Sequence, residues 1–369
     1  MNRRDFLQSA GLVSASLAFP KTGALFATDS PPANWRTFEV TTRVEILQPS
    51  GTTRVWLPTA LLGETPFQKT LANTFNADGG SAKIVESKAD SLGVISAEFP
   101  EGVRPVLTAT SRIATRDYAV DLSAPTPGNP KNENRASLDY FLRPTKLLPT
   151  DGIVKSTADE ITAKANAHTD LEKARAIYEW IVDNTARNPK TRGCGTGDIR
   201  FMLETKDLSG KCADLNALYV GLARAAGLPA RDVYGIRVAK SDLGYKSLGA
   251  STEKITKSQH CRAEVHLSAY GWVPVDPADV RKVILEEPPA NRPLDDEMVK
   301  LVRARLFGSW EMNWMAYNFA HDVALPGSTA APVGFLMYPQ AESNQGRLDC
   351  LDPDNFKYEI TSRELTASA

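Results

Sequence analysis

Two segments of the sequence carry side chains that could perform nucleophilic chemistry. The first, SGKCADLNALYVGLARAAGLPAR, contains Cys212, and the second, QHCRAEVHLSAYGWVPVDPADV, contains His260, His266 and Asp276. A cysteine thiol becomes a strong nucleophile when a histidine takes its proton, and a carboxylate can hold that histidine in the useful tautomer. These residue types therefore predict covalent acyl transfer through a thioester.

The cysteine stands where a helix should begin. Apolar residues recur downstream at helical spacing, at Leu215, Leu218, Tyr219 and Leu222. Cys212 therefore falls in the first turn, where the helix dipole and unpaired backbone N–H groups favour the thiolate. Gly210 would let an acyl substrate approach the backbone closely. The competing interpretation is that Cys212 is a small buried residue, as most free cysteines are.

The two histidines share one face of a predicted strand. In HCRAEVHL the polar side chains are even-numbered and the apolar ones odd-numbered, which predicts a half-buried strand. If the apolar faces match across the following hairpin, Asp276 lies on the histidine face. A loop over 269–271 sets Asp276 diagonal to His266, whereas a loop over 267–271 sets it diagonal to His260. Both histidines remain candidates at this point.

A metal site is a further interpretation of the same segment, with His260, His266, Cys261 and Asp276 as ligands. The alternation places Cys261 on the face opposite the histidines, which argues against it. No calcium-loop pattern such as DxDxDG occurs. We therefore expect neither a metal nor a cofactor.

These blocks resemble the transglutaminase-like superfamily, whose core is papain-like. The resemblance covers Asp170–Asp279 and consists of Gly-x-Cys at the start of a helix, a His-x-x-x-Glu strand, and Gly-Trp-x-x-x-Asp-Pro on the next strand. It implies that Cys212 is the nucleophile, His260 its base and Asp276 the residue that orients the imidazole. Arg262 stands where the family often has tryptophan, so the neighbouring pocket should differ in shape and charge.

The resemblance implies a thiol-dependent enzyme that acts on amide bonds of a peptide or protein, with cell-wall peptide as one candidate. We expect water as the acyl acceptor, as in a peptidase or amidase. The alternatives are a protein-glutamine transglutaminase, which uses an amine, and a non-catalytic periplasmic binding module. The backbone N–H of Cys212 could stabilise the oxyanion. Gln259 and the Gly193–Gly197 loop are candidates for a second donor.

Several elements must position these residues. Short alternating segments over 35–123 predict an N-terminal β-sandwich, and the proline-rich stretch 124–135 predicts a linker. Helical patterns dominate the first part of 136–369 and strand patterns the second. That order predicts an α+β catalytic domain with C-terminal strands, and the resemblance implies a helix bundle packed on an antiparallel sheet.

The N-terminus predicts export. MNRRDFLQ, followed by the apolar AGLVSASLAF, is typical of a twin-arginine signal peptide, here over residues 1–27, and implies a periplasmic location. The apolar run is too short to hold the mature chain stably in a membrane. A formal net charge of −1 gives no field that would attract nucleic acid. With Cys212 catalytic, the remaining Cys194, Cys261 and Cys350 allow at most one disulfide.

Overall fold

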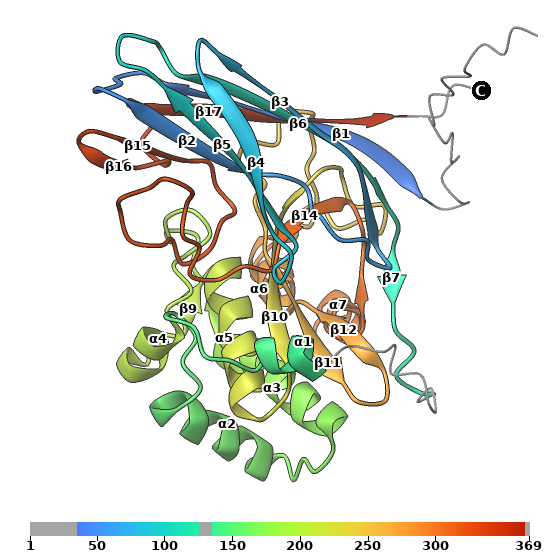
Figure 1. The fold of residues 1–369 in the computed structure, drawn as a ribbon. Coiled ribbons are helices and arrows are strands. Elements are labelled where there is room, and N and C mark those ends of the chain that lie inside the picture. Colours follow the sequence, from blue (N-terminus) through green and yellow to red (C-terminus); the bar gives the residue numbers. More distant parts are fainter. Residues whose placement is uncertain (1–34, 125–134, 366–369) are drawn as a thin grey trace, which may run out of the picture.

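The computed structural model describes residues 35–124 and 135–365. The predicted signal peptide and nearly all of the predicted linker lie outside the described residues. A β-sandwich occupies one end of the molecule and the helices the other, with a further sheet between them (Figure 1). The expected α+β class is confirmed. Among the described residues, none of the helices has the length and apolar content needed to span a bilayer.

The sandwich consists of two antiparallel sheets. One has the order β17-β1-β6-β3, with β17 (Phe356–Leu365), β1 (Arg36–Ile46), β6 (Val106–Thr115) and β3 (Gln68–Asp78). The other has the order β16-β15-β2-β5-β4, with β16 (Gly346–Leu348), β15 (Gln340–Ser343), β2 (Thr53–Pro58), β5 (Leu92–Phe99) and β4 (Ser81–Ser87). Side chains from both sheets, such as Val44, Val55 and Phe99, form a shared core.

The last strands of the described chain belong to this sandwich. β17 pairs with β1 from Thr37↔Leu365 to Ile46↔Phe356, and β15 pairs with β2. Our sequence-based assignment grouped these strands with the catalytic domain, and their hydrogen bonds place them in the sandwich instead. The local pattern of a strand specifies its buried face and not its partner, so sequence order alone was a poor guide.

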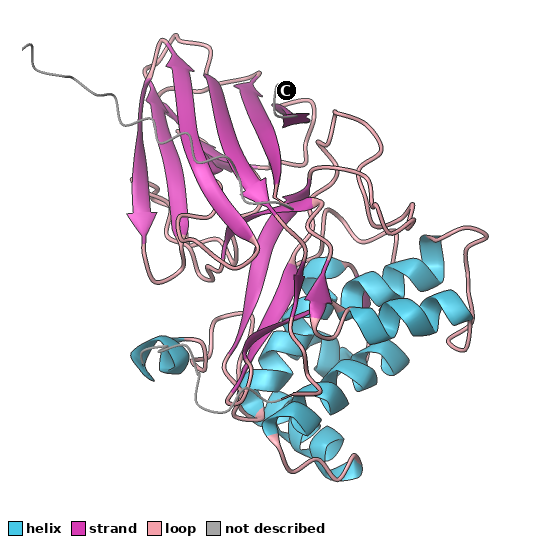
Figure 2. Ribbon diagram, turned by 90° about the vertical axis from the view of Figure 1, so that its right-hand side faces the viewer, coloured by secondary structure: helices cyan, strands magenta, loops and turns pink. Residues whose placement is uncertain are grey.

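The second part of the molecule is a helix bundle packed on an antiparallel sheet, as expected (Figure 2). The sheet has the order β12-β11-β10-β14, with β12 (Gly271–Val275), β11 (Arg262–Leu267), β10 (Ala230–Arg237) and β14 (Trp314–Asn318). The helices are α1 (Arg135–Tyr140), α2 (Gly152–Lys164), α3 (Asp170–Asn184), α4 (Ile199–Thr205), α5 (Cys212–Ala225), α6 (Pro277–Glu286) and α7 (Glu297–Arg305). Two small pairs complete the fold, β7 (Tyr118–Ala119) with β13 (Ser309–Trp310) and β8 (Ala186–Arg187) with β9 (Ser209–Gly210).

Helix α5 is the centre of this part of the fold. Every residue of α5 is buried, because the helix packs against α2, α3 and α6 and against strands β10 and β11. A helix enclosed on all sides must pair its polar side chains internally. Arg224 does so by donating a hydrogen bond from Nε to the carbonyl oxygen of Ala230, at 2.8 Å.

Strand β11 is also more enclosed than its alternation suggested. All six of its residues are buried, so the polar face is covered as well as the apolar one. Two of the covered polar side chains are ion-paired: Glu264 lies 2.7 Å from Arg231, and Arg262 lies 3.7 Å from Asp276. An alternating pattern therefore marked a charged interior rather than a solvent-facing surface.

Candidate active site

Cys212 is the first residue of α5, as predicted from the helical spacing. The side chain of Asp214, on the same turn, accepts hydrogen bonds from the backbone N–H of Lys211 and from those of Thr196 and Gly197. These contacts fasten the glycine-rich loop onto the start of the helix. The N–H groups of this loop are thereby used for structure, which removes residues 196 and 197 as oxyanion donors.

Two glycines make room for that carboxylate. A Cβ atom on Gly195 would lie 1.9 Å from Asp214 Oδ2, and a Cβ on Gly210 would lie 2.5 Å from the same atom. Gly195 also has a φ of +101°, which disfavours any other residue. The group that approaches Gly210 is therefore a side chain of the protein, whereas we had expected a substrate there.

The Cys212 thiol lies among other thiols. Its side chain is buried, and Cys194, Cys261 and His260 surround it. Hydrogen bonds from Cys194 and Cys261, joined by one from His260, lower the pKa of the Cys212 thiol well below its usual value, although burial opposes this. All four cysteines of the chain are free. Cys212 is therefore the thiol that ionises most readily.

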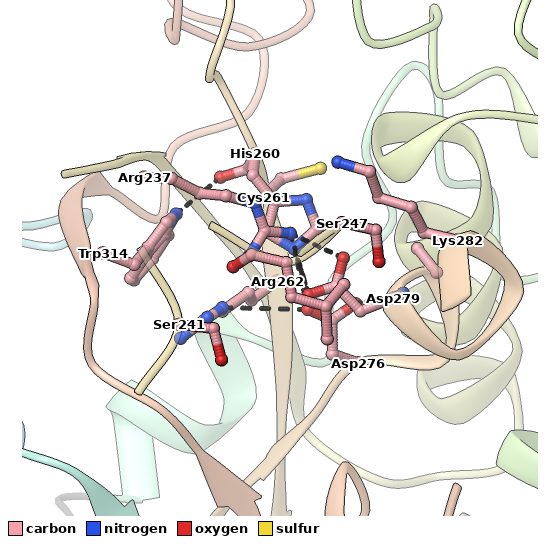
Figure 3. Close-up of polar contacts among 12 residues, drawn as sticks. Arg237, Ser241, Ser247, His260, Cys261, Arg262, Asp276, Asp279, Lys282 and Trp314 are labelled. Atoms are coloured by element: carbon pink, nitrogen blue, oxygen red, sulfur yellow. Dashed lines mark hydrogen bonds and ion pairs between the residues drawn. The ribbon is translucent and has the colours of Figure 1, made fainter. Parts of the chain in front are cut away.

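The hairpin register brings one of the two histidines to the aspartate. Strands β11 and β12 pair Ala263 with Val275 and close with Leu267 opposite Gly271. That register puts Asp276 opposite Arg262 and diagonal to His260, the second of the two alternatives left open above. His260 Nε2 lies 2.8 Å from Asp276 Oδ2 (Figure 3).

His266 lies away from this pair. It is opposite Trp272 in the hairpin, and the two rings meet edge-on with centroids 5.5 Å apart. The structure thus brings together Cys212, His260 and Asp276 and leaves His266 in aromatic packing.

A second carboxylate and an arginine extend the cluster. Asp279 Oδ2 lies 3.4 Å from His260 Nε2, and Arg237 holds both oxygens of Asp279 at 2.6 and 2.8 Å (Figure 3). Burial works against ionisation of Asp279, but Arg237 and His260 lower its pKa well below the usual value. Burial and the neighbouring Asp279 raise the pKa of Asp276.

These charges favour a protonated imidazole. Burial and the positive charge of Arg237 oppose protonation of His260, but Asp279 and Asp276 outweigh them and raise its pKa to about 9. Together with the lowered pKa of the Cys212 thiol, the raised pKa of His260 favours a thiolate–imidazolium pair between the two residues. This is the charge state that a cysteine nucleophile needs.

Hydrogen bonds from neighbouring side chains hold the pair in place. Asn216 Nδ2 donates to Asp276 Oδ1 at 3.1 Å and to the carbonyl of Cys261 at 2.8 Å. Trp314 Nε1 donates to the carbonyl of His260 at 2.9 Å. Asp276 also caps α6, because its Oδ1 accepts from the backbone N–H of Asp279 at 3.0 Å.

Four of the supporting residues were not predicted from the sequence: Arg237, Asp279, Asn216 and Trp314. One weak signal was present. Asp279 follows Asp276 by three positions at a helix start, where the two lie on one turn. Nothing local marked Arg237, which comes from a different strand.

The metal ligands considered above are not assembled among the described residues, because His266 packs on Trp272. Cys261 does not point away from His260 as the alternation suggested: β11 begins only at Arg262, so the residue before it is free to face Cys212. Ligand atoms of His260, Asp276 and Asp279 do lie within 4.8 Å of one another. Their negative charge is already balanced by guanidinium groups, which argues against a cation there.

A pocket of about 530 Å³ opens beside the thiol. Its lining includes Cys194, which contacts Cys212, and Lys211 and Gln259, which directly precede Cys212 and His260 in the chain. Gln259 is buried, and its side-chain nitrogen makes no hydrogen bond to any described residue, although the Tyr358 hydroxyl lies beside the side chain. Such a buried donor is costly unless a ligand meets it.

Three comparisons relate the chain to known proteins. Residues 155–277 match the sequence model of the Transglutaminase-like superfamily. An uncharacterized protein of Haemophilus influenzae is 34% identical over 344 residues, which cover 89% of this chain and 91% of that protein. The crystal structure of a proposed cysteine protease from Cytophaga hutchinsonii is similar in fold, with a TM-score of 0.56 and 15% identity, over 91% of this chain and 93% of that one.

Proposed function

Because the chain belongs to the transglutaminase-like superfamily, we propose that it is a thiol-dependent acyl-transfer enzyme that acts on amide bonds through Cys212, His260 and Asp276. One observation supports this most strongly. A buried histidine lies 2.8 Å from a buried aspartate and contacts a thiol of lowered pKa at the start of a helix. A binding module would have no need of this charge arrangement, which costs desolvation energy.

The reaction follows from the orientation of the imidazole. Nε2 of His260 is committed to Asp276, so Nδ1 is the nitrogen left for Cys212. The Cys212 thiolate attacks the amide carbonyl, and the His260 imidazolium gives its proton to the leaving amine. The product of this half-reaction is a thioester on Cys212 and a free amine.

The oxyanion needs hydrogen-bond donors near the start of α5. The next two N–H groups of the helix are used, because Ala213 donates to the carbonyl of Cys194 and Asp214 to that of Lys211. The backbone N–H of Cys212 has no intrahelical acceptor and can donate to the oxyanion. The unpaired side-chain nitrogen of Gln259 supplies the second donor in this proposal.

We take water as the acceptor of the acyl group, because hydrolysis needs no second binding site for an amine. His260, neutral after the first step, removes a proton from the water, and the thioester is cleaved to an acid and the Cys212 thiol. The substrate would be a peptide or protein. The twin-arginine pattern in residues 1–27 supports work in the periplasm, where cell-wall peptide is one accessible substrate.

Alkylation of the purified protein with iodoacetamide at neutral pH tests the nucleophile. Cys212 should be modified far faster than Cys350, a half-buried thiol whose pKa is raised to about 11 by burial and so serves as an internal reference. The variant His260→Ala should slow modification of Cys212 and leave that of Cys350 unchanged. Equal rates at the two cysteines in the native protein would refute the proposed nucleophile.

Acyl transfer is measured separately on a mixture of peptides, with and without a labelled primary amine. The native protein should generate new peptide termini, and the variant Cys212→Ala should not. Incorporation of the amine in place of hydrolysis would overturn water as the acceptor while keeping the nucleophile. Absence of both products with every peptide and protein tried would count against an enzyme.

A further inference from the structure

The pocket beside Cys212 has walls from both parts of the fold. One wall is the catalytic core, with Cys194, Lys211 and Gln259. The other comes from the C-terminal segment, including Phe356 and Tyr358 of β17, which pairs with the sandwich. Its volume of about 530 Å³ is in the range of pockets that enclose small ligands or a few residues of a peptide.

The charged residues that line the pocket are all positive. They are Lys211, Lys257 and Lys357, and no aspartate or glutamate lines it. Lys211 donates from Nζ to the carbonyl of Thr191 at 2.7 Å, so its position is fixed. Lys257 and Lys357 are exposed and form no ion pair with any described residue. The lining of the pocket therefore carries a net positive charge.

Two acidic residues near Lys357 are already paired with other cations. Glu45, opposite Lys357 in the sheet, is bound by Arg43 and Arg104. Glu359, two residues further along β17, is bound by Lys254. The free lysines of the pocket are thus left to attract an anion from solution.

The pocket lining combines two kinds of polar group. Gln259, which directly precedes His260 in the chain, has an unpaired side-chain amide nitrogen that suits a carbonyl oxygen. Lys257 and Lys357 suit a carboxylate. A substrate whose scissile carbonyl lies at Cys212 would thus place a nearby negative group against the lysines.

We propose that this pocket binds a carboxylate of the acyl substrate, so that the enzyme selects peptides carrying an acidic group close to the scissile amide. The carboxylate can be an acidic side chain or a free C-terminus. This inference rests on the proposed function, because it assigns a substrate class to the same thiol.

A pair of alkylating reagents tests the inference without a known substrate. Iodoacetate carries a carboxylate, and iodoacetamide is its neutral analogue. Relative to the native protein, the double variant Lys257→Gln/Lys357→Gln should lose about tenfold in the rate at which iodoacetate modifies Cys212. Its rate with iodoacetamide should change less than twofold. In the native protein, the ratio of the iodoacetate rate to the iodoacetamide rate should also fall as salt is added.

The matched control is Lys83→Gln/Lys88→Gln, which removes two exposed lysines at β4 and just beyond it, outside the pocket lining. It lowers the net charge equally and should leave both rates as in the native protein. If the pocket variant lowers the iodoacetate rate no more than this control, the inference is wrong while the proposed nucleophile stands. If Cys212 reacts slowly with both reagents in the native protein, it is the proposed function that fails.

Protection by tripeptides separates the two carboxylate sources. Ala-Glu-Ala amide offers a side-chain carboxylate, Ala-Ala-Ala a C-terminal one, and Ala-Ala-Ala amide neither. Protection of Cys212 from iodoacetamide by the first identifies an acidic side chain, and protection by the second a free C-terminus. Equal protection by all three, or by none at millimolar concentration, would overturn recognition of a carboxylate.

Discussion

The variant Asp276→Asn probes the charge arrangement that we assign to the active site. It keeps the size of the side chain and removes the negative charge 2.8 Å from His260. The pKa of His260 rises from 6.5 to about 9 in the folded protein, which corresponds to about 3 kcal/mol in favour of the charged imidazole. Asp276 supplies both a charge and a hydrogen bond to this total.

We assign to Asp276 roughly 2 kcal/mol of it, or about 1.5 pH units. The pKa of His260 should therefore fall towards about 7.5 in the variant. The thiolate–imidazolium pair exists only at pH values between the pKa of Cys212 and that of His260. The lower pKa of His260 in the variant therefore reduces the upper limit of this pH range.

The pH titration of the His260 imidazole, followed by NMR between pH 5 and 10, measures the effect. At pH 8.5 about three quarters of His260 should be charged in the native protein and about a tenth in Asp276→Asn, roughly an eightfold loss. The matched control is Asp232→Asn, which removes a buried aspartate 3.0 Å from a different histidine, His321. Superimposable profiles for the native protein and a folded Asp276→Asn, or an equal shift in Asp232→Asn, would refute the reasoning.

Three further predictions follow from the same cluster. Cys194→Ala removes a hydrogen bond to the Cys212 thiolate and should move the onset of alkylation to higher pH; an unchanged onset would show that the contact is not used. Arg237→Met leaves Asp279 buried without its guanidinium partner and should lower the free energy of unfolding, measured in urea, by about 3–5 kcal/mol. A loss of less than about 1 kcal/mol would show that the ion pair contributes little. His260 binds its proton more tightly in the folded state, so its contribution to stability is complete below pH 6.5 and is lost as pH rises to about 9. The melting temperature should fall over that range in the native protein and fall less in His260→Gln; parallel curves would contradict the raised pKa.

Some helix boundaries depend on local patterns that can be read from the sequence. Helix α3 begins after Thr169. The Thr169 hydroxyl accepts a hydrogen bond from the backbone N–H of Glu172, and the Glu172 carboxylate accepts one from the backbone N–H of Thr169. This capping box is readable from the sequence. Helix α5 begins at Cys212 because apolar spacing starts there. Such features depend on residues three or four positions apart, and a single segment contains all the information.

Features that depend on distant segments could not be predicted. The alternation of β11 put two histidines on one face, and only the hairpin register, set by how the strands close at Leu267 and Gly271, selected His260. Arg237 reaches Asp279 because β10 and α6 meet in space. The resemblance to a family selected the same histidine, but it carried no information about this second ion pair.

The pairing of β17 with β1 has a consequence for biosynthesis. These strands come from opposite ends of the described chain, so β1 has no partner on that side until residues 356–365 have left the ribosome. Contacts of such long range close slowly and leave strand edges exposed in the meantime. The ribosome thus synthesises the segments that carry Cys212 and His260 before it synthesises residues 356–365, which contribute to one wall of the pocket beside them. A chain released early would carry the reactive thiol without the part of the molecule that we expect to choose its substrate.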